Sequence, residues 1–518
     1  MAKFNTQFAM IARRSPVVTA AAPAGLTYEG APGYARDAKG ELFLLAVAMM
    51  VSEGSYYEDA ATRDARYEAL AAQVAVEDPQ WMARFVRWLR DEATMRSASL
   101  VAALQAARAM VDAGVPGSRR IVDSALQRAD EPGEALAWWT GRYGRTIPKP
   151  VKRGIADAVR RLYTEFALLR YDTATKGFRF GDVLELTHPA PASPEQGALF
   201  AWALARRRNR PQAVPAALPM VAANEQLRAA AKRDPRVLLD TEALRAAGFT
   251  WEDALSLASS TVDRAALWTA LIPTMGYMAL LRNLRNFDEA GVPDEVAATV
   301  AQRLADPDEV AQSRLFPFRF LAAYRATSSV RWAAALERAL NASLRRVPRL
   351  TGRTLILVDL SGSMQVPVAG ARSRLSCADA AKVFGAALAL RADDPTLVWF
   401  DTESGRVPVR PGTALLTLVE SFPPGGGGTN TAAAVRRWYH RHDRVVIVTD
   451  EQAHYDGDRD VTAGVPRHVP VYTWNLGGYR LGHAPSGLGT RHTFGGLTDA
   501  AFQAIPLLER RQDAPWPF

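Results

Sequence analysis

Apolar residues recur at three- and four-residue intervals through most of the first 350 positions. Clear examples are the segments 40–54, 68–93, 98–114 and 151–169, punctuated by Gly, Pro or Asp. This spacing places the apolar side chains on one face of an α-helix. Because many such segments follow one another without a convincing strand run, we predict antiparallel helix pairs stacked into a HEAT-like solenoid. The sequence has no strict period, so this prediction depends on the helical pattern alone.

Short β-branched runs replace this pattern near residue 350. Alternation of such runs with helices is typical of an α/β domain with a mainly parallel sheet. The predicted strands are 354–360, 396–400, 444–450 and 469–476, and the helices between them are 376–392 and 429–442. We therefore expect an α plus α/β protein, with a helical domain over residues 1–350 and an α/β domain over residues 351–518.

Length and composition agree with a two-domain protein of a reducing compartment. A chain of 518 residues is too long for one hydrophobic core. Its single cysteine, Cys377, excludes a disulfide framework and a thiolate metal cluster. The first residues lack the apolar core of a signal peptide, and no run approaches the roughly 20 apolar residues of a membrane helix. We expect a cytoplasmic protein without a membrane segment.

Oxygen-bearing side chains follow the predicted strands of the α/β domain. Asp359, Ser361 and Ser363 form a D-x-S-x-S pattern after the first strand, Thr429 ends a Gly-rich loop, and Asp450 ends the strand 444–450. Ligands bind beyond the carboxyl ends of strands in such sheets. Carboxylates and hydroxyls are hard ligands that suit Mg²⁺ or a similar ion. The sequence therefore predicts a divalent-metal site built from these five residues.

Other interpretations of the same residues are a structural turn, a phosphate loop and a catalytic site. In the first, the serines only cap the following helix. The Gly-rich loop lacks the Lys-Ser/Thr ending of a phosphate loop, so nucleotide binding is not supported. Ser361 and Ser363 lack a G-x-S-x-G elbow, and no histidine is spaced as an obvious base. We expect no enzyme.

The metal-site pattern resembles the metal-ion-dependent adhesion site (MIDAS) of von Willebrand factor A domains, which have a Rossmann-like fold. The resemblance implies that Ser361, Ser363 and Thr429 coordinate the ion directly, and that Asp359 and Asp450 act directly or through water. It also implies one open coordination position for an acidic group. The expected occupant is a carboxylate or phosphate of a partner.

The positive charge lies in the helical part of the chain. The whole chain has 63 Lys and Arg against 54 Asp and Glu; residues 351–518 have 17 against 16, which leaves 46 against 38 for residues 1–350. Arginine predominates, and its planar side chain pairs with phosphate and stacks on bases. An anionic polymer is therefore a candidate partner. The alternative is an Ala- and Arg-rich composition in which Arg only solvates the surface.

One basic cluster is nearly unopposed by acidic residues. It surrounds Tyr143 and contains only Asp157 as an acid; its members are Arg142, Arg145, Lys149, Lys152, Arg153, Arg160 and Arg161. Such a cluster neutralises phosphates and gives salt-dependent affinity for nucleic acid. It predicts an RNA contact, and a solvated helix face is the alternative.

Three segments of the helical half resemble the TROVE module of the Ro autoantigen family. They are 178–189 (FRFGDVLELTHP), 276–286 (GYMALLRNLRN) and 313–321 (SRLFPFRFL). Phe316 stands where the family usually has the histidine of a His-Pro-Phe motif, so any role of that imidazole is absent. Together with the C-terminal domain, the resemblance covers nearly the whole chain.

The resemblance implies a fold and a function. It implies a ring of HEAT-like helices closed by the von Willebrand factor A domain. It also implies a non-enzymatic, monomeric ribonucleoprotein that binds Y-like noncoding RNA on its outer basic surface and single-stranded 3′ ends of misfolded RNA in its central hole. A 3′ exoribonuclease such as polynucleotide phosphorylase is a further expected partner. The alternative function is a metal-dependent protein–protein adaptor without RNA, which would not explain the charge excess of the helical half.

Individual residues of the helical half have competing roles. His188 is predicted to stack on a base, and its alternative is a helix cap. Arg282 and Arg285 either line the hole or pair with Asp288 and Glu289. A second basic run is predicted to contact phosphate on the outer surface: Arg206, Arg207, Arg208 and Arg210.

Overall fold

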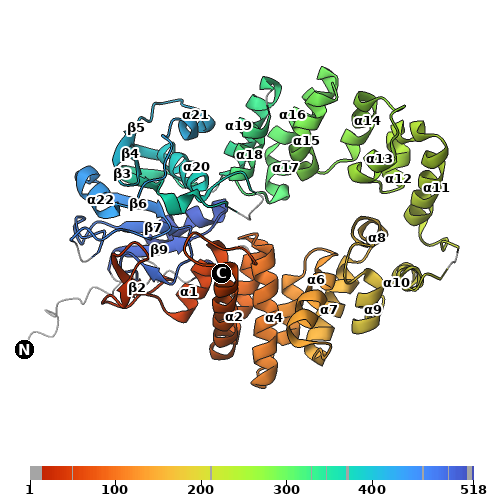
Figure 1. Ribbon diagram of the computed structural model, residues 1–518, viewed down its shortest axis with the longest axis horizontal. Helices are drawn as coiled ribbons and strands as arrows, with labels where there is room; N and C mark the ends of the chain where they lie inside the picture. Colours follow the sequence, from red (N-terminus) through yellow and green to blue (C-terminus); the bar gives the residue numbers. More distant parts are fainter. Residues whose placement is uncertain are drawn as a thin grey trace, which may run out of the picture.

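The computed structural model describes residues 15–48, 51–210, 213–327, 329–345, 347–368, 373–457, 460–487, 489–509 and 516–518. Figure 1 shows helices that follow one another around a ring. A C-terminal sheet domain, residues 350–509, lies between the last helices and the first ones. The expected α plus α/β fold class is confirmed, whereas the domain boundary at residue 350 stays a prediction.

Helices of the first half pack on near neighbours in the chain: α2 on α4, α5 on α7, and α9 on α10. Their bounds are α1 Ala38–Ala48, α2 Ala60–Glu77, α3 Pro79–Asp91, α4 Arg96–Asp112, α5 Ser118–Ala125, α6 Glu131–Tyr143, α7 Lys149–Leu162, α8 Glu165–Tyr171, α9 Phe180–Thr187 and α10 Pro194–Arg207. Their apolar faces form one hydrophobic core that extends from Val17 to Val221.

Two segments that the apolar pattern predicts as single helices are helix pairs. The segment 68–93 is divided between α2 and α3 at Asp78, because Pro79 has no N–H to donate to the preceding turn. The Asp78 side chain accepts from the backbone N–H of Trp81 and caps α3. The segment 151–169 is divided in the same way, because Thr164 caps α8 through the N–H of Ala167.

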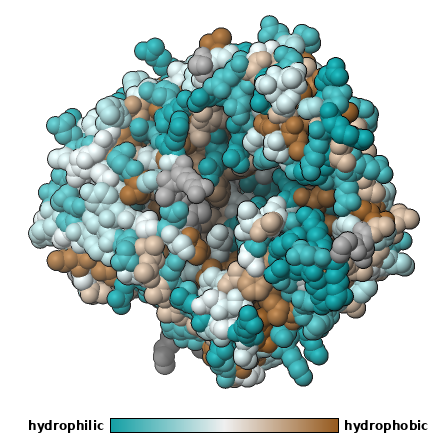
Figure 2. All heavy atoms as spheres, turned by 45° about the vertical axis from the view of Figure 1, so that its right-hand side comes forward, coloured by the Kyte–Doolittle hydropathy of each residue, from teal (hydrophilic) through white to brown (hydrophobic). Residues whose placement is uncertain are grey.

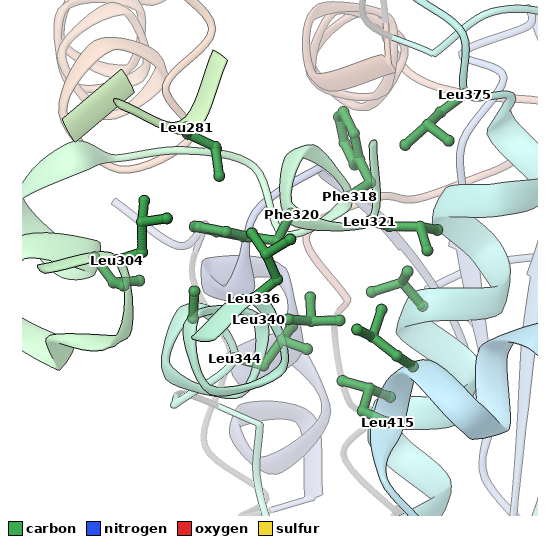
Figure 3. Close-up of a cluster of buried hydrophobic side chains, with 14 of the residues drawn as sticks. Leu281, Leu304, Phe318, Phe320, Leu321, Leu336, Leu340, Leu344, Leu375 and Leu415 are labelled. Atoms are coloured by element: carbon green, nitrogen blue, oxygen red, sulfur yellow. The ribbon is translucent and has the colours of Figure 1, made fainter. Parts of the chain in front are cut away.

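Helices of the second half lead back to the sheet domain. Their bounds are α11 Pro219–Arg233, α12 Thr241–Ala246, α13 Trp251–Leu257, α14 Arg264–Leu271, α15 Tyr277–Glu289, α16 Asp294–Ala305, α17 Pro307–Ser313, α18 Phe318–Ala326 and α19 Ala333–Ser343. Figure 3 shows the junction, where Phe318 and Leu321 of α18 lie next to Leu375. The hydrophobic core continues across this junction from Leu227 to Leu508.

The sheet domain has a six-stranded sheet in the order β5-β4-β3-β6-β7-β9. Every neighbouring pair is parallel except β4 and β5. The bounds are β3 Leu350–Asp359, β4 Ala392–Phe400, β5 Ser404–Val407, β6 Arg444–Thr449, β7 Val471–Asn475 and β9 Arg491–Gly495, with α20 Cys377–Ala389, α21 Leu415–Glu420, α22 Thr431–Trp438 and α23 Ala504–Glu509. The mainly parallel sheet is as expected, and β5 and β9 are strands that the apolar pattern did not indicate.

A second, three-stranded sheet joins the two ends of the ring. It has the order β1-β2-β8, with β1 Gly25–Leu26, β2 Pro32–Ala35 and β8 Leu481–Gly482, and both pairs are antiparallel. The helical part of the chain therefore contains two short strands for which the sequence has no convincing strand run. These strands are too short for an alternating apolar pattern, and β2 meets its partner β8 only in the folded ring.

Buried polar contacts accompany this closure. Arg36 forms an ion pair with Glu451, and both side chains are 1% exposed. Arg36 Nη1 also donates to the carbonyl of Tyr479 over 2.6 Å. At the other end of the chain, Trp516 and Phe518 pack on Trp81 of α3. The N-terminal segment, α3 and the C-terminal residues together join the ends of the ring.

No helix among the described residues is both long and apolar enough to cross a membrane.

His483 makes the closure sensitive to acid. It follows β8 and is fully buried, and burial, followed by the charge of Arg36, lowers its pKa from 6.5 to about 3. Its folded-state pKa is below its unfolded value, so its contribution to stability is present above pH 6.5 and is lost as the pH falls toward 3. Between pH 8 and pH 5 we expect a loss of about 2 kcal/mol in the free energy of unfolding. Urea unfolding of the wild type and His483→Leu checks this, because the variant lacks this pH dependence. Parallel pH profiles would contradict it.

Candidate metal centre and nucleic-acid interface

The five predicted metal ligands meet at one edge of the six-stranded sheet. Asp359 is the last residue of β3, and Asp450 directly follows β6. The register pairs Val358 with Val448, so the ends of these two strands lie side by side. The other three residues come from the loop after β3 and the Gly-rich loop before α22; the five residues are Asp359, Ser361, Ser363, Thr429 and Asp450, and all are at most 4% exposed.

Hydrogen bonds orient both carboxylates. The N–H of Ser361 and the hydroxyl of Thr449 donate to the two oxygens of Asp359, over 2.9 and 2.6 Å. Ser361 Oγ and Ser363 Oγ are 3.3 Å apart. The N–H of Gln452 donates to Asp450 Oδ1 over 3.0 Å, whereas Asp450 Oδ2 has no hydrogen-bond partner among the described residues. One buried carboxylate oxygen is therefore left without a donor.

Burial and mutual repulsion disfavour negative charge on this pair. Burial raises the pKa of Asp450, and the nearby charge of Asp359 raises it further. Burial likewise raises the pKa of Asp359. A divalent cation would compensate both charges, so the residues present fit a metal ion. The described ranges contain no group of three or more His, Cys, Asp or Glu side chains that could hold a metal ion. Hydroxyl oxygens would therefore have to complete this site.

Close backbone packing explains the Gly-rich loop. The N–H of Gly362 donates to the carbonyl of Gly427 over 2.8 Å. A Cβ at Gly425 would collide with the carbonyl oxygen of Leu360, and one at Gly428 would collide with the ring of His454. Glycine therefore lets this loop approach the residues after β3. Ser361 precedes the short 3₁₀ helix Gly362–Gln365 but makes no side-chain cap bond to it, so the capping alternative has no support here.

Residues of the N-terminal part also reach this edge, which the sequence did not indicate. A pocket of about 340 Å³ is lined by Ser363 and Asp450 together with Glu53 and Arg63. The side chain of Ser363 also lies close enough to Tyr57 to lower the pKa of its hydroxyl, against the larger raising effect of burial. Nothing in the spacing of residues about 300 positions apart could have signalled these contacts.

The predicted basic cluster divides into paired and unpaired side chains. Arg142 pairs with Glu68, and Arg161 pairs with Asp123. Asp157, the acid inside the cluster, pairs with Arg119 of α5. The remaining members form no ion pair with a described residue and lie on or just before α7; they are Arg145, Lys149, Lys152, Arg153 and Arg160. We call these five residues the α7 basic face.

The other predicted RNA contacts belong to other helices. His188 is exposed and ends α9 in the left-handed conformation, with φ 48°. Arg285 pairs with Glu289 over 2.6 Å, whereas Arg282 lines a pocket of about 720 Å³. The second basic run is largely neutralised, because three of its arginines pair with acids: Arg206 with Asp172, Arg207 with Asp182 and Arg208 with Glu185.

The 720 Å³ pocket lies between the two halves of the ring. It is lined by α8 of the first half and by residues of α13, α15 and α17 of the second half. Figure 2 shows a hollow near the middle of the molecule in this view. Aromatic residues on both sides contribute to the pocket: Phe166, Tyr171, Phe249, Trp251 and Tyr277.

Comparisons with known proteins agree with this architecture. The family model described as the TROVE domain matches residues 246–372. Telomerase protein component 1 of Rattus norvegicus is 43% identical over 77 residues, and that of Mus musculus is 42% identical over 77 residues. Each match covers 14% of this chain and 3% of the length of the relative.

A solved structure matches over almost the full length. The crystal structure of the Deinococcus radiodurans Ro (Rsr) protein superposes with a TM-score of 0.61 at 18% sequence identity, and the match covers 91% of this chain and 99% of that one. At this identity the likeness shows the fold. Residues 246–372 thus resemble the TROVE domain, and the fold of the chain is similar to that of a Ro protein.

Proposed function

We propose that this protein is a non-enzymatic RNA-binding ring that holds structured RNA on its outer surface and single-stranded RNA at its central hollow. The α7 basic face is the observation that supports this proposal most directly. Its five cations form no ion pair with a described residue, and they belong to a ring that matches the TROVE-domain model over residues 246–372. Unpaired surface cations attract phosphates, because no neighbouring carboxylate already satisfies them. Y-like noncoding RNA and misfolded RNA with 3′ tails are the proposed ligands.

The central pocket has the chemistry of a single-strand site. Arg170 lies over the rings of Phe166 and Tyr171, at 5.8 and 5.6 Å from their centroids. Phe166 is 43% exposed although it is a large apolar residue. Exposed aromatic rings beside arginine stack on unpaired bases, and such stacking tolerates any sequence. These features support entry of a single strand between α8 and α15.

We also propose that the sheet domain is a von Willebrand factor A domain that holds Mg²⁺. The proposed ligands are Asp359, Ser361, Ser363, Thr429 and Asp450. When bound, the ion supplies a positive centre that attracts a carboxylate or a phosphate oxygen. The protein residues fix the position of the ion and compensate its charge with the two buried carboxylates.

The metal proposal predicts a loss of Mg²⁺ affinity on removal of one hydroxyl. Ser361→Ala should weaken Mg²⁺ binding at least about tenfold, because even residues that only support a metal ligand contribute that much. Isothermal titration calorimetry of the full chain measures this affinity. Ser343→Ala in α19, whose hydroxyl donates to the carbonyl of Leu340 in its own helix, is the control. Equal affinities of the two variants would refute the metal assignment.

The RNA proposal predicts which cations matter. A variant with Lys149→Gln, Lys152→Gln and Arg153→Gln should bind a duplex with a 3′ single-stranded tail at least about tenfold more weakly at 0.1 M salt. The slope of log K against log salt should fall by roughly one for each phosphate that the variant no longer neutralises. Fluorescence anisotropy across a salt series checks both quantities.

The control removes the same charge from arginines that already pair with acids: Arg108→Gln, Arg207→Gln and Arg208→Gln. It should retain most of the affinity, although its net charge equals that of the first variant. Equal weakening of both variants would reduce the effect to net charge and contradict the α7 site. No RNA binding by the wild type at low salt would favour the metal-dependent adaptor.

A further inference from the structure

A second cavity lies next to the 720 Å³ pocket. It has a volume of about 620 Å³, and Leu169, Thr173 and Asp253 line both cavities. Most of its other lining residues belong to α10 and α11, which Figure 1 shows where the first half of the ring passes into the second. A strand in the 720 Å³ pocket therefore has a neighbouring cavity on the side of these two helices.

The chemistry of the two cavities differs. Aromatic residues are frequent around the 720 Å³ pocket, whereas the 620 Å³ pocket is lined by Arg206, Arg210 and Arg228. The guanidinium group of arginine pairs with phosphate through a planar fork of N–H donors. One cavity thus offers surfaces for bases, and the other offers donors for phosphate.

The acids around these arginines do not compensate all of the positive charge. Three carboxylates line the 620 Å³ pocket, and they are those of Asp172, Glu225 and Asp253. Asp172 also pairs over 2.7 Å with Arg179, which does not line the pocket, whereas Arg206 Nε lies 3.7 Å from the same oxygen. Four arginines therefore share three carboxylates.

Arg210 is the arginine that has the surplus charge. It is exposed and forms no ion pair with a described residue, whereas Arg228 pairs with Asp253. Burial lowers the pKa of Arg206, and the positive charges of Arg179 and Arg228 lower it further, so these side chains repel one another. An anion between them would relieve this repulsion.

We propose that the 620 Å³ pocket holds a phosphate of the RNA strand whose bases stack in the 720 Å³ pocket. This inference rests on the single-strand site proposed above. Arg210 donates to the phosphate oxygens, and Arg206 and Arg228 attract the same group from α10 and α11. Because phosphate contacts carry no sequence information, this pocket positions a strand of any sequence at the junction between the two halves of the ring.

Arg210→Gln tests the proposal, because it removes one exposed positive charge and breaks no ion pair with a described residue. Fluorescence anisotropy of the full chain with a single-stranded oligouridylate should show about fivefold weaker binding than the wild type at 0.1 M salt. The slope of log K against log salt should fall by about 0.7, which corresponds to one phosphate contact of a single strand. Arg210→Lys keeps the charge and should keep the wild-type slope.

The matched control is Arg233→Gln, which removes another exposed arginine. Arg233 ends α11 and does not line the 620 Å³ pocket. This variant should bind the oligouridylate as the wild type does, with the same salt slope. Equal weakening of Arg210→Gln and Arg233→Gln, wild-type binding by Arg210→Gln, or a reduced slope in Arg210→Lys would each overturn the proposal.

Uridine 5′-monophosphate distinguishes a strand from a free nucleotide. It should bind far more weakly than the oligouridylate, because it lacks the further bases and phosphates that bind along a strand. If the mononucleotide instead binds as tightly as the oligouridylate and loses this affinity in Arg210→Gln, the pocket is a nucleotide site and the proposal is wrong.

Phe166→Ala separates failure of the phosphate pocket from failure of the single-strand site. Phe166 is one of the aromatic residues that line the 720 Å³ pocket. If Phe166→Ala weakens oligouridylate binding while Arg210→Gln does not, the single-strand site stands and the phosphate pocket is wrong. If the wild type binds no oligouridylate at low salt, both are wrong.

Discussion

The buried ion pair between Arg36 and Glu451 is the contact on which the closed ring depends. Both side chains are 1% exposed, so each charge has exchanged water for the other. Asn475 donates to Glu451, and the carbonyl of Tyr479 accepts from Arg36. Loss of either partner would leave an uncompensated buried charge, at a cost of about 3–5 kcal/mol. A hydrophobic pair of equal volume could be as stable, so the ion pair chiefly specifies which segment docks and in which register.

The contacts that close the ring and the candidate metal centre share the loop after β6. Glu451 directly follows the proposed ligand Asp450, and Gln452 accepts a hydrogen bond from the N–H of Tyr28 over 2.9 Å. Docking of the N-terminal segment therefore fixes the loop that carries one side of the proposed metal site. The other junction, between α18 and the sheet domain, is mainly hydrophobic. Because the hydrophobic effect has no direction, this junction stabilises the ring without specifying which residues pair. The ring is thus held by an apolar junction and a polar one.

Much of the fold, and the position of the proposed metal ligands at one sheet edge, could be predicted because the signals are local. Helices such as α7 follow the 3.6-residue period, and β3 and β6 contain short apolar runs that lead to Asp359 and Asp450. The closure could not be predicted, because β2 has only four residues and pairs with β8 across more than 400 positions. The ion pairs of the basic residues could not be predicted for the same reason. Glu68 and Arg119, which decide that Arg142 and Asp157 are both paired, come from other helices.

The closed ring requires that the N-terminal segment of each chain docks on its own sheet domain. Ala35 and Leu481 are directly paired across β2 and β8, and antiparallel partners have Cα atoms within the range that a disulfide spans. The most direct measurement is mild oxidation of an Ala35→Cys, Leu481→Cys variant in a Cys377→Ala background, followed by peptide mass spectrometry and light scattering. The closed ring predicts a disulfide between positions 35 and 481 within a monomer. A chain that stays reduced, or a disulfide that forms only between two chains, would contradict it.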